Sequence, residues 1–166
     1  MSTLLQFADA LQQSALGSGI AESRYAFPII EGVHLIGLSV AIGLLFITDL
    51  RLADVLFKKV PAAAVLRHLR PWVLGGFAVI LISGGLLFLA EAPEVITSPA
   101  FALKFVFILI AAANAAYFEF VIARRPGVLA DGGVLPRNVK FAGLASLTLW
   151  TLVIVCGRLI PYLPGT

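Results

Sequence analysis

Four long apolar stretches, separated by short polar connections, set the pattern of the chain. They cover about residues 25–48, 71–90, 100–123 and 141–162. A helix needs about 20 apolar residues to cross roughly 30 Å of hydrocarbon, and each stretch is long enough. Open strands are excluded because lipid cannot satisfy the hydrogen bonds of a sheet edge. The pattern predicts an all-α integral membrane four-helix bundle, in a transmembrane domain over residues 21–166.

A shorter amphipathic pattern precedes the first span. Its apolar positions recur at helical spacing, at Leu4, Phe7, Ala8, Leu11 and Ala15. Polar residues occupy much of the other face, so residues 1–20 are predicted to form an amphipathic helix in the outer membrane interface. We expect the segment Gly17 to Ile20 to break this helix, and Pro28 to lie in the first turn of the first span.

The composition agrees with a lipid environment. Of the 166 residues, 60% are apolar and 13% are charged, whereas soluble domains are about 45–50% apolar and about 25% charged. An ordinary soluble enzyme and a disordered tail are therefore excluded. A single cysteine, Cys156, excludes an intrachain disulfide. The net charge of +3 does not indicate nucleic-acid binding, because the basic residues lie in loops between spans instead of on one soluble face.

The distribution of basic residues predicts the orientation. Nine of the twelve lie in the first and third connections, at Arg51, Lys58, Lys59, Arg67, Arg70, Arg124, Arg125, Arg137 and Lys140. Short loops rich in Lys and Arg stay in the cytoplasm. The N-terminus and the C-terminus are then both external.

Four ionisable residues at the external end form the candidate ligand-binding site: Glu31, His34, Lys104 and Arg158. A charge within the bilayer costs at least about 2.5–3.5 kcal/mol, so its presence asks for an explanation. Glu31 and His34 are three apart and share a helix face. Lys104 and Arg158 come to a similar depth on two other helices, and either could pair with Glu31. Such a pocket could bind a ligand, with the two cations suited to an anionic group, or exchange a proton.

A structural interpretation stands beside this one. Lys104 and Arg158 lie near helix ends and could extend to the interface, and the remaining polar groups could only fix helix packing. The protein would then be an accessory or structural membrane subunit. Membrane lipids are expected partners, with a homo-oligomer or a partner membrane subunit as a further candidate. Small-residue pairs such as Gly37 with Ala41 and Ala112 with Ala116 favour close packing within the bundle, with a homodimer interface as the alternative.

Counting ligands limits the cofactors. The chain has two histidines and one methionine, Met1, so a two-haem site with four histidines and an internal His–Met site are excluded. A single haem on His34 remains as a minority alternative. Copper lacks a second soft ligand near His34. No catalytic or phosphate-binding motif is visible, so no catalytic residue is assigned and an enzyme is the less favoured class.

Several short strings together carry a family resemblance. They are Glu22-Ser23, Phe27-Pro28, Glu31 with His34 and Gly37, Asp49-Leu50-Arg51-Leu52, Pro71-Trp72, Pro99-Ala100-Phe101 followed by Lys104, Asn114, Leu149-Trp150 and Gly157-Arg158. In this order they resemble an uncharacterised family of bacterial four-helix inner-membrane proteins, a domain of unknown function. The resemblance implies the fold and the inner membrane, and no activity.

The chain departs from that family pattern at one position. Glu119 stands where the resemblance leads us to expect a histidine near the end of the third span. A metal site that used this histidine would not be shared by this protein. A looser likeness connects the first span with small haem- or copper-associated membrane proteins, and it rests on His34.

Overall fold

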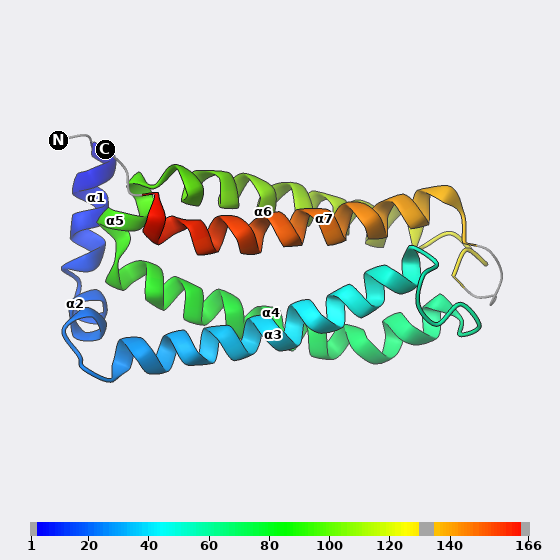
Figure 1. The fold of residues 1–166 in the computed structure, drawn as a ribbon, viewed down its shortest axis with the longest axis horizontal. Helices are drawn as coiled ribbons and strands as arrows, with labels where there is room; N and C mark the ends of the chain where they lie inside the picture. The colour runs from blue at the N-terminus through cyan, green and yellow to red at the C-terminus, as the bar shows by residue number, and fades with distance from the viewer. Residues whose placement is uncertain (1–2, 130–134, 164–166) are drawn as a thin grey trace.

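The computed structural model describes residues 3–129 and 135–163, which are almost entirely helical. Four long helical segments lie along the long axis of the molecule (Figure 1). They are α3 (Ala26–Leu52), α4 (Ala62–Ala90), α6 (Pro99–Tyr117) continued by the π-helical turn η1 (Phe118–Ile122), and α7 (Arg137–Leu159) continued by the 3-10 turn η2 (Ile160–Tyr162). All four are long and apolar enough to cross a membrane. The predicted all-α class and the four spans are confirmed.

Three short helices lie across one end of the long helices, where both ends of the chain are also found (Figure 1). They are α1 (Thr3–Gln12), α2 (Ala15–Ala21) and α5 (Ala92–Thr97). We call this the terminal end, and the opposite end, which holds the connections after α3 and η1, the loop end. The Gln12 side chain donates a 2.7 Å hydrogen bond from Nε2 to the Ala90 carbonyl at the end of α4. This bond ties the N-terminal segment to the spans.

The predicted break in the N-terminal helix is misplaced. The segment Gly17 to Ile20 is helical and belongs to α2, and the chain breaks at Gln13 and Ser14 instead. Ser14 starts the new helix because its hydroxyl accepts a hydrogen bond from the Gly17 N–H at 3.2 Å. Gly17 serves a close contact, since a Cβ there would stand 2.9 Å from the Leu89 carbonyl oxygen of α4.

The spanning helices begin and end close to the predicted positions, with one large difference. Pro28 lies in the first turn of α3, as expected. Helix α4, however, begins at Ala62 and contains Pro71, which was predicted to start the span. The polar residues Arg67 and Arg70 in this extra segment are exposed. The predicted start of this span lies after the last charged residue, Arg70. The helix itself continues beyond the apolar segment, because charged residues can also be helical.

The long helices form two hairpins, α3 with α4 and α6 with α7, and α3 packs on α7 to join them. Small residues mark the closest approaches within and between hairpins. A Cβ on Gly76 of α4 would stand 2.7 Å from Cβ of Ala41, and one on Gly143 of α7 would stand 2.8 Å from the Asp49 carbonyl oxygen. Such positions let helix backbones approach closely in the absence of a hydrophobic driving force.

Aromatic pairs add contacts between the hairpins. The rings of Phe77 on α4 and Trp150 on α7 have centroids 4.8 Å apart, and those of Phe88 on α4 and Phe101 on α6 are stacked at 5.6 Å. These distances are typical of favourable aromatic pairs.

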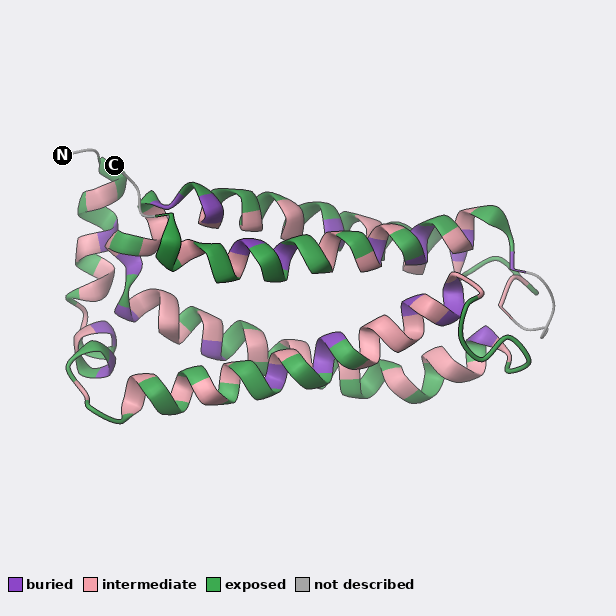
Figure 2. Ribbon diagram, in the orientation of Figure 1, coloured by how far each residue is buried: buried purple, intermediate pink, exposed green. Residues whose placement is uncertain are grey.

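Most side chains of the four spans face outward (Figure 2). Only 17–28% of the most apolar window of each span is buried within the chain. Large apolar side chains such as Leu81 and Phe141 are each 72% exposed. A molecule that exposes so much apolar surface is suited to lipid as its solvent.

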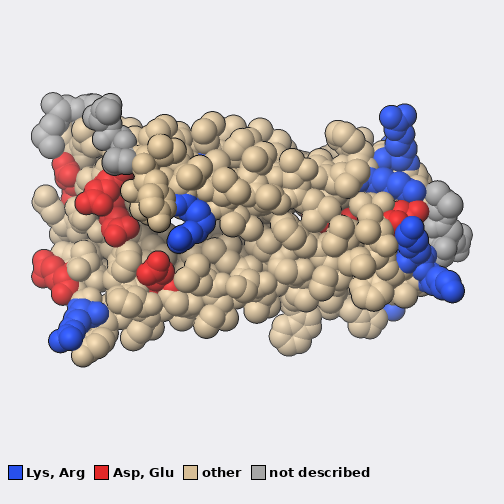
Figure 3. All heavy atoms as spheres, in the orientation of Figure 1, with Lys and Arg blue, Asp and Glu red and all other residues tan. Residues whose placement is uncertain are grey.

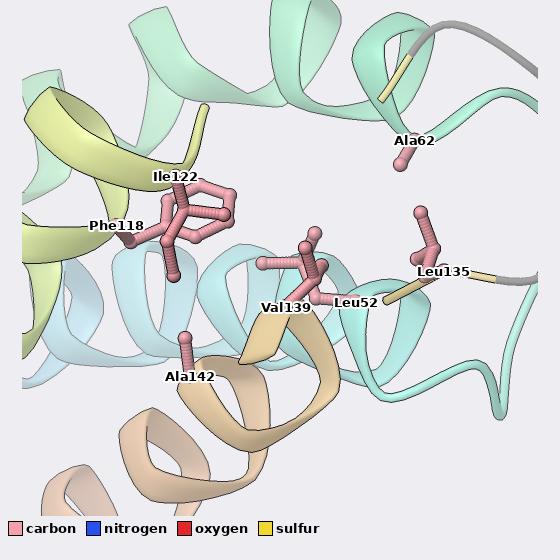
Figure 4. Packing of buried hydrophobic residues seen from close by; sticks show 7 residues of the cluster. All are labelled: Leu52, Ala62, Phe118, Ile122, Leu135, Val139 and Ala142. Atoms are coloured by element: carbon pink, nitrogen blue, oxygen red, sulfur yellow. The ribbon is translucent and has the colours of Figure 1, made fainter. Parts of the chain in front are cut away.

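A buried apolar cluster closes the loop end (Figure 4). It brings together the ends of all four long helical segments and consists of Leu52, Ala62, Phe118, Ile122, Leu135, Val139 and Ala142. The connections after α3 and η1 are thereby anchored on a common core.

Candidate functional site

His34 connects α3 to α4 at the level of Ser83. Its Nδ1 lies 2.9 Å from the Ser83 hydroxyl oxygen. That hydroxyl also donates to the Val79 carbonyl at 2.6 Å, which uses its only proton. With that proton on the Val79 carbonyl, the Ser83 oxygen accepts from His34, and we therefore assign the proton of the neutral ring to Nδ1. Nε2 is left with a lone pair that can take a proton or another ligand.

A glycine makes room for the ring on α4. A Cβ on Gly84 would stand 3.1 Å from Cε1 of His34. The side chain is half-buried. Ser83 and Gly84 were not among the predicted site residues. Ser83 could have been noticed as a polar residue within the second span, which has no charged residue. Its contact with His34 depends on the register between α3 and α4, which the sequence does not give.

Lys104 reaches the same region from α6. Its ammonium lies beside Gly157 of α7, where a Cβ would stand 3.4 Å from Nζ. The side chain is half-buried, and no carboxylate of the described residues comes within 4.0 Å of it. Glu31 precedes His34 by about one turn of α3. No hydrogen bond or ion pair among the described residues joins Glu31, His34 and Lys104.

The predicted ion pair of Glu31 is not formed. The ion pairs within residues 3–129 and 135–163 involve neither Glu31 nor Arg158, and neither of the two cations proposed as its partner comes within 4.0 Å. Both Glu31 and Arg158 are exposed. Because each can reach the membrane surface, neither needs the other to remain charged. Arg158 lies at the terminal end of α7, and no ion pair among the described residues joins it to the other three.

A second set of charged residues holds the loop after α3. Arg51 is fully buried, and its Nε donates to the Val60 carbonyl at 2.8 Å. Asp54 receives Lys140 of α7 at 2.9 Å and lies 3.7 Å from the Arg51 guanidinium. The hydrogen bond from Lys140 lowers the pKa of the Asp54 carboxyl, and the charge of Lys140 lowers it further. These contacts fold the loop back on α7, which is a structural role.

The described residues hold no group of three His, Cys, Asp or Glu side chains arranged to bind a metal ion. Both histidines have one ring nitrogen in a hydrogen bond, Nδ1 of His34 with Ser83 and Nδ1 of His68 with the Ala64 carbonyl. His34 is the half-buried one and lies among the predicted site residues, whereas His68 is exposed near the start of α4.

Comparison with known protein families matches residues 17–163 to a family of unknown function, DUF6644. The chain belongs to the DUF6644 family. The resemblance expected from the sequence strings is confirmed, and the DUF6644 family brings no activity with it. No curated protein and no solved structure matches the chain.

Glu119 has a partner in this DUF6644 chain. Its carboxylate forms an ion pair with the Arg70 guanidinium of α4. The pair joins η1 to α4 at the loop end. The residue at the position where a histidine was expected thus connects the two hairpins through an ion pair.

Charge is distributed unevenly between the two ends of the DUF6644 structure (Figure 3). Acidic side chains gather at the terminal end and most basic side chains at the loop end. Among the acidic residues, Glu91 follows α4 directly. Partial burial raises the pKa of the Glu91 carboxyl, and the neighbouring charges of Glu94 and Glu31 raise it further.

Proposed function

We propose that the protein is a bacterial inner-membrane protein that binds a small acidic molecule from the external side and exchanges a proton with it through His34. The observation that carries the proposal is the hydrogen bond from His34 to Ser83, which fixes Nδ1 as the donor and leaves Nε2 as a proton acceptor. The uneven distribution of Lys and Arg supports an external terminal end.

Lys104 supplies the second part of the argument. An ammonium group that is partly removed from water is stabilised by an anion with which it can form charge-assisted hydrogen bonds. The described residues offer Lys104 no carboxylate at that distance. A carboxylic acid that transfers its proton to His34 Nε2 would leave a carboxylate that can pair with the Lys104 ammonium. The imidazolium of His34 gives the proton back when the acid is released. Arg158, exposed at this end, would attract the anion.

The test measures the imidazole 15N signals of both histidines, with His34 as the probe of the site and His68 as the reference. In protein labelled with 15N-histidine in nanodiscs, benzoate is titrated as a model acid and the imidazole signals are recorded. We expect a saturable shift of the His34 Nε2 signal and none at His68, which is exposed near the start of α4. In Lys104→Gln the shift should be lost, whereas the matched control Arg67→Gln should retain it.

Two results would contradict the proposal. A shift of equal size at both histidines would show a general effect of the added acid. No saturable shift at His34 would favour the accessory-subunit interpretation, in which His34 and Lys104 only fix packing.

A haem-associated function is a second candidate, because a histidine with one ring nitrogen held by a hydrogen bond is also typical of metal ligation. The optical spectrum of protein purified from haem-replete cells distinguishes the two. A Soret band that is lost in His34→Ala would establish haem ligation through His34, and its absence from the wild-type spectrum would remove this candidate.

A further inference from the structure

We infer that the groove between α6 and α7 at the loop end binds the head group of an anionic phospholipid. The groove has a volume of about 590 Å³, within the range of sites that hold small molecules. It is lined by Asn114 and Tyr117 of α6 and by Arg137, Asn138, Phe141 and Ala142 of α7. It is separate from the His34 site, which lies near the terminal end.

On α7 the lining changes from charged to apolar along the helix axis. Arg137 is the first residue of α7, and Phe141 follows one turn deeper. Tyr117 of α6, about one and a half turns before this helical segment ends at Ile122, lines the same groove. A cation at the start of α7, followed by a tyrosine and by the apolar Phe141, matches the order of phosphate, glycerol ester and acyl chain in a phospholipid.

Arg137, the basic residue that lines the groove, has no carboxylate partner among the described residues, in contrast to Arg70 and Lys140. Arg70 pairs with Glu119, and Lys140 pairs with Asp54. The charges of Arg70 and Lys140 are therefore compensated, whereas the described residues 3–129 and 135–163 place no carboxylate within 4.0 Å of Arg137. The first turn of α7 adds favourable electrostatics, because a helix N-terminus favours a phosphate.

Polar groups deeper in the groove favour a lipid over a second protein helix. The Asn114 amide donates a 3.0 Å hydrogen bond to the Ala142 carbonyl, which holds the groove wall together. The oxygen of this amide and the hydroxyl of Tyr117 remain to interact with the ester region of a lipid. Charge complementarity selects the anionic class, since a zwitterionic head group would offer Arg137 a phosphate that is already compensated.

The first experiment is native mass spectrometry of the full chain in detergent that contains equal amounts of phosphatidylglycerol and phosphatidylcholine. We expect one retained phosphatidylglycerol, with its affinity lowered about five-fold in Arg137→Gln, the loss expected for one basic group at an anionic surface. The matched control Arg67→Gln removes an exposed cation at the same end but on the other hairpin, and it should retain the wild-type affinity.

Equal losses in the two variants would mean diffuse attraction to basic charge and would overturn the site. No preference for phosphatidylglycerol over phosphatidylcholine would also overturn it.

A second measurement needs no variant. Spin-labelled phosphatidylglycerol in nanodiscs should broaden the amide signals of Tyr117 and Phe141 more than spin-labelled phosphatidylcholine at the same mole fraction. Equal broadening by the two lipids would show that ordinary bilayer contact covers the groove, and the inference would be wrong.

Discussion

At the scale of single residues, the most informative contact is the one that fixes the tautomer of His34. The sequence placed His34 within the first span but could not identify Ser83 as its partner. Pairing them requires the register of α3 against α4, which is set by the length of the loop and by close contacts such as Gly76 with Ala41. A candidate residue is visible in the sequence, whereas its hydrogen-bond partner is a property of packing.

Ser83→Ala tests this contact. Without the hydroxyl, the ring loses the acceptor that faces Nδ1, so it should shift toward the Nε2–H tautomer that dominates in unconstrained imidazoles. The 15N chemical shifts of His34 report this change directly. Ser39→Ala is the matched control, because the Ser39 hydroxyl bonds only to its own helix, at the Leu35 carbonyl. A wild-type ring protonated on Nε2 would contradict the assignment.

The absence of an ion pair at Glu31 gives a second prediction at this scale. Glu31→Gln and Arg158→Gln should each change stability little, because both side chains are exposed. Their effects should add to within about 0.5 kcal/mol in the double variant. Unfolding in mixed detergent micelles measures the cycle. A double variant that recovers the losses of the single ones would show that the pair forms in the membrane after all.

Asp54 predicts how stability depends on pH. Its carboxyl has a lowered pKa in the folded protein, so its ion pair stabilises the fold above the ordinary aspartate pKa of about 3.9. That contribution is lost as the pH falls through the lowered value. Asp54→Asn should therefore reduce the melting temperature at pH 7, and the difference from wild type should shrink in acid.

Asparagine suits this position because Asp54 has a positive φ of 62°, a conformation that Asn also tolerates. Glu22→Gln removes an exposed carboxylate and serves as the control. A difference that stays constant down to pH 2 would show that Asp54 does not act through its charge.

At the scale of elements, hydrophobic length predicted the four spans well, and their ends less well. The extra turns of α4 before Pro71 carry exposed charges, so hydropathy cannot include them. The π-helical turn η1 and the separate helix α2 were also not predicted. Each depends on tertiary contacts, such as the approach of Gly17 to Leu89. Hydropathy identifies the part of a helix that is apolar enough to lie in lipid, but it does not identify the residues at which the helix begins and ends.

The close approach of α3 and α4 predicts a sharp difference between two adjacent glycines. Gly76→Ala would place a methyl group 2.7 Å from Cβ of Ala41 and should destabilise the protein by about 1–3 kcal/mol. Gly75→Ala meets no atom within 4 Å and should be neutral or slightly stabilising, because alanine favours helix more than glycine does. Unfolding in mixed detergent micelles compares them, and equal effects would contradict the packing.

At the scale of the whole molecule, an even number of spans brings both termini to one end (Figure 1). Hydropathy locates the spans but does not say which end of the molecule faces the cytoplasm. That orientation is predicted from the positions of Lys and Arg in the sequence. The structure adds that the acidic residues gather at the end opposite to most of the basic ones (Figure 3). The side on which each end lies is still a prediction.

Reporter fusions test the orientation. Alkaline phosphatase and fluorescent protein fused after Lys59 and after Pro126 should both report the cytoplasm, because these positions lie in the basic connections. Fusions after Glu94 and at the C-terminus should report the outside. An external score at Lys59 would reverse the orientation and would move the proposed ligand entry to the cytoplasmic side.

The chain could be cut between the two hairpins without separating the two helices of either one. The connection between α5 and α6 is short, and each hairpin returns to the side from which it started. A backbone cut at Ser98 would therefore leave two fragments, each with an even number of crossings and a complete turn of its own. Co-produced as separate polypeptides, they would have the same contacts of α3 with α7 available for reassembly, so this topology predicts that the two fragments associate in the membrane.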